Sequence, residues 1–206
     1  MRFEELALDE RIAASISALG FEEATPIQAE AIEPLLAGKD IIGQARTGSG
    51  KTAAFGLPLL ELVKDTPKGV RALVLAPTRE LALQVTDALR SYSKGLPVRL
   101  LSVYGGAPYP PQLKALRKGV QVVVGTPGRV LDHIERGSLD LSKLELLVLD
   151  EADEMLRMGF IEAIQEVLEA TPPDRQIALF SATMPKPIQK VANRFLNDPV
   201  HLHVES

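Results

Sequence analysis

The chain has 206 residues, of which 46% are hydrophobic and 24% are charged, and it contains no cysteine. This composition predicts one globular domain with a buried core, and it excludes a disulfide framework and a thiolate metal site. The formal net charge of −4 argues against strong non-specific binding of nucleic acid but leaves room for a local site. No apolar run approaches the length of a membrane span, and the acidic N-terminus is unlike a signal peptide. We therefore expect a soluble, cytoplasmic protein with no membrane partner.

Two helices are expected before the first strand. Apolar residues recur at helical spacing between Leu6 and Leu19, and Asp9 is a candidate N-cap within this segment. Thr25 can cap a second helix that begins with Pro26 and ends near Leu36.

From residue 40 onward, short apolar runs alternate with helical patterns. The expected strands cover residues 40–43, 70–76, 98–104, 120–125, 144–150, 176–182 and 200–204. The expected helices cover residues 53–63, 80–91, 111–118, 128–135, 154–169 and 187–195. Because the strands show no polar alternation, both faces of the sheet should be covered by helices. The sequence therefore predicts a single α/β domain built on a mostly parallel sheet.

A phosphate-binding loop is predicted where the first strand meets the next helix. Residues 45–52 read Ala-Arg-Thr-Gly-Ser-Gly-Lys-Thr. Gly48 and Gly50 would let backbone N–H groups close around phosphate oxygens. Lys51 would contact the β- and γ-phosphates, and the Thr52 hydroxyl would bind Mg²⁺. The pattern has Ala45 where glycine is usual, so a glycine-rich helix cap with a solvated lysine is the alternative. The other loop residues predicted to contact the nucleotide are Arg46, Thr47 and Ser49.

Acidic residues follow one of the apolar strands. Asp150 stands where a phosphate-loop NTPase places the acid that holds Mg²⁺. Glu151 could orient or deprotonate the attacking water. The alternative is that Asp150 and Asp153 only cap the helix that follows. The combination of Asp150 and Glu151 with Lys51 and Thr52 favours hydrolysis of a nucleoside triphosphate.

Further polar segments follow other strands. In an open α/β sheet such strand ends lie at one edge, which is where ligands bind. Arg79 and Arg129 each follow a threonine near a strand end, and arginine there can bind phosphate bidentately. The pair Gly105–Gly106 allows another backbone to approach closely. The alternative is that the two arginines form salt bridges to Glu80 or Asp132.

The three histidines receive no predicted role. His201 and His203 lie on the same face of a strand, but no third ligand is nearby to complete a metal site. His133 lies in a predicted helix with no partner in view.

Together these segments resemble the DEAD-box RNA helicase family over nearly the whole chain. The residues Asp150-Glu151-Ala152-Asp153 match the motif that names the family. The phosphate loop precedes it, and this family too commonly has alanine at the first loop position. The other matching motifs, in family order, are Pro77–Leu81, Gly105–Gly106, Thr126–Arg129 and Ser181–Thr183. The segment Gly20–Gln28 is similar to the family's adenine-recognising segment, although Ala24 stands where proline is frequent.

The resemblance implies a RecA-like (P-loop NTPase) fold, ATP hydrolysis with Mg²⁺, and local separation of RNA duplexes. Gln28 would read the base edge of adenine, with Phe3 and Phe21 packed near the base. The implied catalytic residues are Lys51, Asp150 and Glu151, with Thr52 and Asp150 at the metal.

The resemblance also implies an RNA site. Ser181 and Thr183 would couple the nucleotide state to RNA by bridging back to Asp153. The residues expected to hold the RNA backbone, without regard to base sequence, are Pro77, Thr78, Arg79, Gly105, Gly106, Thr126, Gly128 and Arg129.

One departure from the family concerns length. A complete member has a second RecA-like domain, which carries further RNA contacts and the arginines that reach the γ-phosphate. We expect residues 1–206 to be one N-terminal domain, with residues 1–38 as the adenine-recognition segment and flanking helices, and with the C-terminal RecA-like domain absent. Such a chain should bind adenine nucleotide, bind RNA weakly and hydrolyse ATP barely. The alternatives are a nucleotide-dependent RNA-binding clamp without helicase activity, a DNA helicase or other RecA-like ATPase, and, least favoured, a GTPase.

Overall fold

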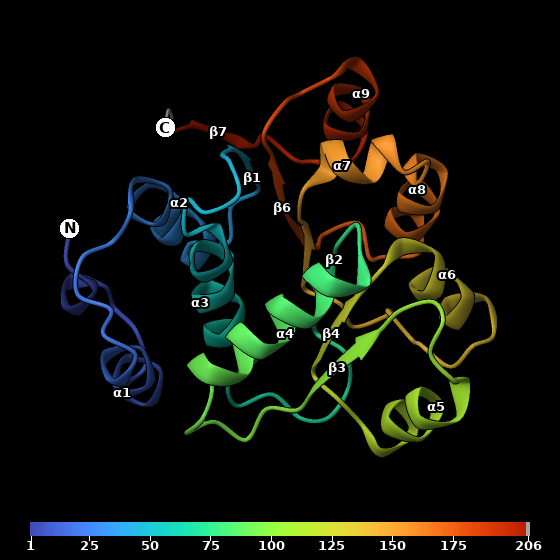
Figure 1. Cartoon of the computed structure of the whole chain (residues 1–206), viewed down its shortest axis with the longest axis horizontal. Coiled ribbons are helices and arrows are strands. Elements are labelled where there is room, and N and C mark those ends of the chain that lie inside the picture. Colours follow the sequence, from blue (N-terminus) through green and yellow to red (C-terminus); the bar gives the residue numbers. More distant parts are fainter. Residues whose placement is uncertain (205–206) are drawn as a thin grey trace.

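A seven-stranded sheet forms the centre of the computed structural model, which describes residues 1–204 (Figure 1). The strand order is β3-β4-β2-β5-β6-β1-β7, and every neighbouring pair is parallel. The strands are β1 (Ile41–Gln44), β2 (Ala72–Leu75), β3 (Leu100–Val103), β4 (Val122–Gly125), β5 (Leu146–Leu149), β6 (Gln176–Ser181) and β7 (Val200–His203). The predicted parallel sheet is therefore confirmed.

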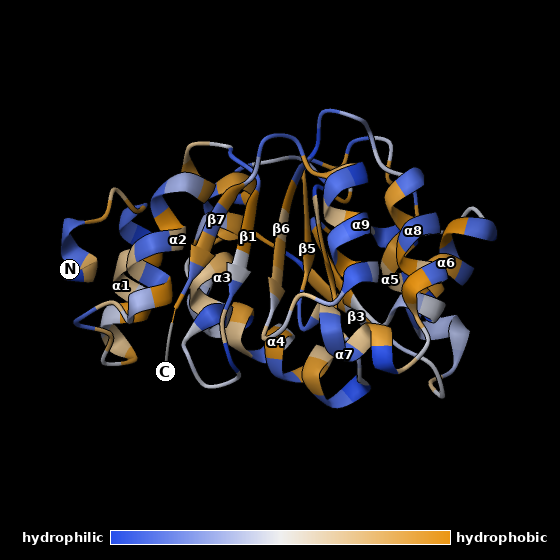
Figure 2. Ribbon diagram, turned by 90° about the horizontal axis from the view of Figure 1, so that it is seen from above, coloured by the Kyte–Doolittle hydropathy of each residue, from blue (hydrophilic) through white to orange (hydrophobic). Residues whose placement is uncertain are grey.

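Helices cover both faces of this sheet, also as predicted (Figures 1 and 2). A short 3₁₀ helix (Phe3–Glu5) precedes α1 (Glu10–Ala18), α2 (Pro26–Leu36), α3 (Lys51–Val63) and α4 (Arg79–Tyr92), which pack on one face. The other face is covered by α5 (Tyr109–Lys118), α6 (Pro127–Glu135), α7 (Ala152–Arg157), α8 (Ile161–Glu169) and α9 (Lys186–Phe195). No helix within residues 1–204 combines the length and apolar character that crossing a membrane requires.

The central strands have side chains buried on both faces. Every residue of β2, β4 and β5 is buried. Within β2, Val74 packs into the core beside α3, whereas Leu73 and Leu75 pack into the opposite core. Neighbouring residues of a strand point to opposite faces, so two helix layers are needed to cover an all-apolar strand.

Two predicted helices differ from those in the structure. The first begins at Glu10 and not at Leu6, because Asp9 is the N-cap and its carboxylate accepts the Arg11 N–H at 2.8 Å. The helix expected over residues 154–169 is divided into α7 and α8. Gly159 has a φ of +81°, a left-handed conformation that ends the first of these helices.

Candidate functional site

The carboxyl edge of the sheet divides the predicted site residues into two neighbouring groups. The phosphate loop follows β1, the acidic motif follows β5, and Ser181 is the last residue of β6. These three strands lie together in the order β5-β6-β1. The predicted RNA-binding segments follow β2, β3 and β4, which lie together in the order β3-β4-β2. Since β2 also pairs with β5, the two groups meet at the centre of one edge.

The phosphate loop connects β1 directly to the N-terminus of α3. Gly48 and Gly50 both have left-handed backbone conformations, with φ of +86° and +88°. A Cβ atom on Gly50 would lie 2.6 Å from Gln28 Nε2, so only glycine fits there. The unpaired N–H groups at the start of α3 therefore face a loop that phosphate oxygens can approach closely.

Lys51 is buried and is held by the acidic motif. Its ammonium group donates a hydrogen bond to Asp150 and lies 3.4 Å from Glu151, and only 5% of the residue is exposed. The alternative of a solvated lysine beside a simple helix cap is therefore wrong. The lysine lies at the first position of α3, where it can reach the phosphates of a bound nucleotide.

Asp150 is fully buried, and one of its oxygens has no partner. Its Oδ1 accepts the hydrogen bond from Lys51, whereas Oδ2 has no hydrogen bond within residues 1–204. Burial raises the pKa of Asp150, while the neighbouring ammonium of Lys51 acts in the opposite direction. A buried carboxylate oxygen without a donor fits a cation ligand, because carboxylates are ligands that Mg²⁺ uses in nucleotide sites. The half-buried Thr52 follows Lys51 in α3.

Glu151 has a backbone conformation that few side chains adopt. The φ of Glu151 is 54°, which is in the left-handed region, and Glu151 is the N-cap of α7. Such a conformation costs free energy in a residue with a Cβ atom, and it is found more often where function requires a side chain to be placed. The bend directs the chain from β5 into α7 and leaves the carboxylate near Lys51.

Asp153 connects the acidic motif to the segment after β6. Its backbone N–H donates to Ser181 Oγ at 3.0 Å, and its carboxylate accepts from Thr183 N at 3.1 Å and Thr183 Oγ1 at 2.9 Å. Burial acts to raise the pKa of Asp153, but the hydrogen bonds from Thr183 hold it below its usual value. The carboxylate also accepts the Glu154 N–H at 3.0 Å, so Asp153, which lies within α7, both bridges to Thr183 and pairs an N–H group in the first turn of this helix. The structure thus brings together the three residues assigned to coupling.

Gln28 links the N-terminal segment to the phosphate loop. Its Oε1 accepts the Thr25 N–H at 2.9 Å, and its Nε2 donates to the Gly50 carbonyl at 3.0 Å. One N–H and one lone pair of the amide remain for a ligand, which is the donor–acceptor pair that glutamine offers to adenine. Phe3 and Phe21 pack together, with their ring centroids 5.4 Å apart.

The two arginines assigned to RNA are held by tyrosines and not by carboxylates. The Arg79 guanidinium lies 4.8 Å from the ring centroid of Tyr104, and that of Arg129 lies 4.0 Å from Tyr109. Neither arginine forms a salt bridge within residues 1–204, so the salt-bridge alternative is wrong for both. Asp132 instead contacts Arg136, at 3.5 Å. Stacking on a ring orients a guanidinium without neutralising it, which leaves both charges available to phosphate.

The remaining residues of the RNA set lie around these arginines. Thr78 is the N-cap of α4, and its hydroxyl accepts the Leu81 N–H at 3.1 Å. Gly106 has a φ of +84°. Gly105, Gly106 and Gly128 are exposed, whereas Pro77 is buried and Thr126 is half-buried. An exposed glycine exposes its backbone, so phosphate oxygens can approach at these three positions.

His133 has two close partners, contrary to the sequence-based expectation. It is fully buried, its Nε2 lies 2.7 Å from Gln112 Oε1, and its Nδ1 lies 2.7 Å from Ser138 Oγ. Gln112 Oε1 also accepts from Arg129 at 3.3 Å, and Arg129 donates to the Ala107 carbonyl at 2.9 Å. Burial lowers the pKa of His133, and the positive charge of Arg129 adds to this effect. Neutral His133 thus holds the side chain of Gln112 in place, and Gln112 in turn helps to position Arg129.

The family of the chain is shown by comparison with known proteins. The model of the DEAD/DEAH box helicase family matches residues 25–191, and the chain belongs to this family. It is 52% identical over 205 residues to "ATP-dependent RNA helicase CshA" of Listeria monocytogenes, an alignment that covers 100% of this chain and 39% of that protein. It is 53% identical over 205 residues to "ATP-dependent RNA helicase DeaD" of Escherichia coli, with 99% of this chain and 33% of that protein covered.

Solved structures confirm the RecA-like fold. A DEAD box protein from the hyperthermophile Methanococcus jannaschii matches with a TM-score of 0.96 and 46% identity, over 100% of this chain and 56% of that one. A hypothetical ATP-dependent RNA helicase from Sulfolobus tokodaii matches with a TM-score of 0.89 and 40% identity, over 96% of this chain and 57% of that one. The chain therefore spans well under two thirds of the length of these relatives.

Proposed function

We propose that this chain is the N-terminal, ATP-binding RecA-like domain of an ATP-dependent RNA helicase. The observation that carries the proposal is the joint placement of Lys51, the unpartnered oxygen of Asp150, and Glu151 beside the phosphate loop. Family membership and the printed names of the relatives support ATP and RNA as the ligands. The absence of cysteine and the proposed RNA substrate favour a cytoplasmic location.

In the proposed mechanism, the phosphate loop and the N-terminus of α3 bind the phosphates of ATP. The ammonium group of Lys51 leaves Asp150 and contacts the β- and γ-phosphates, and Glu151 positions the attacking water. Thr52 and Asp150 would hold Mg²⁺, which neutralises charge on the phosphates when bound. Gln28 selects adenine through its amide, with Phe3 and Phe21 near the base.

RNA would bind at the neighbouring group of strand ends. Arg79 and Arg129 would contact phosphates, and the exposed Gly105, Gly106 and Gly128 would allow the backbone to lie close. The contacts of Asp153 with Ser181 and Thr183 join the acidic motif to β6, so a change at the nucleotide can alter this connection. The presence of Lys51 and Glu151 favours an enzyme over a clamp that binds nucleotide without hydrolysis.

The division into domains is part of the proposal. Residues 1–206 would form one domain, and a second RecA-like domain of the longer protein would supply arginines to the γ-phosphate, a contribution of about 10³–10⁵ in rate. The relatives are more than twice as long as the segment they share with this chain, which supports a further domain. The chain alone should therefore bind nucleotide but hydrolyse ATP and unwind RNA poorly.

ATP turnover by the 206-residue chain, measured with and without single-stranded RNA, tests this proposal. Binding of fluorescent ADP serves as the folding control. We expect ADP binding with negligible turnover, and RNA should not stimulate it. RNA-stimulated turnover by this chain alone would contradict the dependence on a second domain, and a folded chain that binds no adenine nucleotide would contradict the nucleotide site itself.

A further inference from the structure

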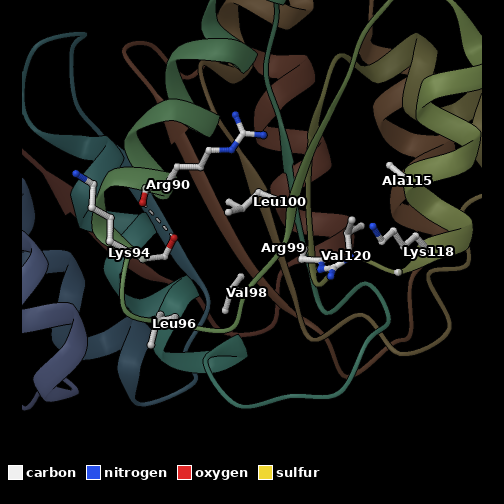
Figure 3. A pocket seen from close by; sticks show the side chains of 11 residues that line it. Arg90, Lys94, Leu96, Val98, Arg99, Leu100, Ala115, Lys118 and Val120 are labelled. Carbon is white, nitrogen blue, oxygen red and sulfur yellow. Dashed lines mark hydrogen bonds between the residues drawn. The ribbon is translucent and has the colours of Figure 1, made fainter.

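A groove of about 470 Å³ lies at the open edge of the sheet beside β3 (Figure 3). It is near the amino ends of the strands, opposite the candidate nucleotide and RNA site. Its walls come from the last turns of α4 and α5, and its floor comes from the start of β3 and from Val120. The residues that carry the argument are Arg90, Lys94, Val98, Arg99, Leu100 and Lys118.

The groove is positively charged in a chain that is acidic overall. Among residues 1–204, the charged side chains that line it are those of Arg90, Lys94, Arg99 and Lys118, and no aspartate or glutamate does so. Within residues 1–204 the only carboxylate contact of these four is the exposed pair Arg90–Asp87 at 3.7 Å. Figure 3 shows Arg90 and Lys94 on the α4 side of Leu100, with Lys118 on the α5 side.

Helix ends explain part of this charge but not all of it. Arg90, Lys94 and Lys118 lie at or just beyond helix C-termini, where cations offset the helix dipole. Arg99 precedes a strand, so this effect does not account for it. A row of cations also discourages edge strands from pairing with one another. Both effects allow an anionic partner, and neither requires the half-buried apolar floor.

The floor of the groove contains an unpaired strand edge. The Arg99 carbonyl accepts from Gln121 N at 3.1 Å, and the Val103 carbonyl accepts from Thr126 N at 3.1 Å. These residues therefore face β4, and by alternation the backbone groups of Leu100, the first residue of β3, face the open side, with Val98 just before the strand. Both of their side chains are half-buried beside that edge. An extended segment could pair with this backbone.

We propose that this groove docks an acidic, extended segment of a partner protein, which adds to the sheet as a strand beside β3. Backbone hydrogen bonds would go to the open edge, apolar side chains to the floor, and carboxylates to the four cations. RNA suits the groove less well, because no aromatic side chain lines it for base stacking. The length of α4, about 20 Å, also separates it from RNA bound at Arg79. The proposal does not depend on the proposed function.

The test uses a fluorescent, end-blocked hexapeptide of alternating glutamate and valine, titrated into the 206-residue chain. We expect saturable binding that weakens with salt, and weaker binding of a peptide N-methylated at alternate residues. Lys118→Glu should weaken binding about tenfold, because it replaces an attraction with a repulsion. Arg117→Glu is the matched control, since Arg117 carries the same charge on the same helix but does not line the groove, and it should leave affinity within about twofold. A circular dichroism spectrum and a cooperative urea transition like those of the parent chain show that each variant is folded.

Four results would overturn the proposal. The first is no binding of the hexapeptide by the folded chain. The second is equal loss in the Lys118→Glu and Arg117→Glu variants, which would mean attraction to the overall surface. The third is displacement of the peptide by single-stranded oligouridine, which would assign the groove to RNA. The fourth is aggregation of the Lys118→Glu variant without loss of peptide affinity, which would mean that the cations only prevent edge strands from pairing with one another.

Discussion

The left-handed backbone of Glu151 predicts an unusual order of stability between two substitutions. Replacement by alanine or glycine removes the same carboxylate and the same 3.4 Å contact with Lys51. Alanine keeps a Cβ atom at a φ of 54°, which costs about 1–2 kcal/mol, whereas glycine does not. Glycine loses about 0.4–1 kcal/mol more through the entropy of the unfolded chain. Glu151→Gly should therefore be more stable than Glu151→Ala by about 1 kcal/mol.

Urea unfolding of the nucleotide-free variants measures this difference. Glu154 supplies a matched control, because it lies within α7 in a right-handed helical conformation. There the order should reverse, with the glycine variant about 1 kcal/mol less stable than the alanine variant. If alanine is at least as good as glycine at position 151, the left-handed backbone imposes no cost and the argument about strain fails.

Three further predictions concern base selection, the support of Arg129 and the effect of pH. Gln28→Ala should abolish the preference for ADP over GDP in competition binding, and an unchanged preference would mean that other groups read the base. Gln112→Leu removes the acceptor shared by His133 and Arg129, so it should lower the free energy of unfolding by about 1–3 kcal/mol and weaken binding of single-stranded RNA more than binding of ADP. An equal loss of affinity for RNA and for ADP would indicate only a folding defect. Burial, with a smaller effect of Arg129, lowers the pKa of His133 in the folded chain, so the unfolded chain binds more protons and stability should fall as the pH drops below about 6.5. His133→Gln should flatten this dependence, and an unchanged slope in urea titrations would assign it to other groups.

Local rules were sufficient where neighbours in sequence determine the structure. Thr25 and Pro26 fixed the start of α2, and Asp9 marked the start of α1 although the apolar pattern began earlier. The division between α7 and α8 was missed, because the apolar pattern continues through Gly159 whereas the backbone does not. Periodicity alone does not report a left-handed residue inside a helical pattern.

The contacts around the arginines could not be predicted in the same way. Gln112 and His133 are 21 residues apart, and only the packing of α5 against α6 brings their side chains together. The tyrosines gave a weak signal, since Tyr104 and Tyr109 flank the glycine pair in sequence. The structure decides against the alternative of salt bridges to Glu80 or Asp132, because Arg79 and Arg129 stack on these rings instead.

The ion pair between Lys51 and Asp150 would compete with a metal ion and with a nucleotide for the same two side chains. The ammonium already compensates the buried carboxylate, so a metal ion that binds alone at the free oxygen of Asp150 would bring a second positive charge next to Lys51. A nucleotide that binds alone would draw Lys51 away and leave Asp150 uncompensated, and an unpaired buried charge costs several kcal/mol. The metal–nucleotide complex would supply a counter-charge to both residues at once. In the proposed site, the Lys51–Asp150 ion pair would therefore favour the metal–nucleotide complex over either ligand by itself, because the pair has to separate before the phosphates and the metal can be held.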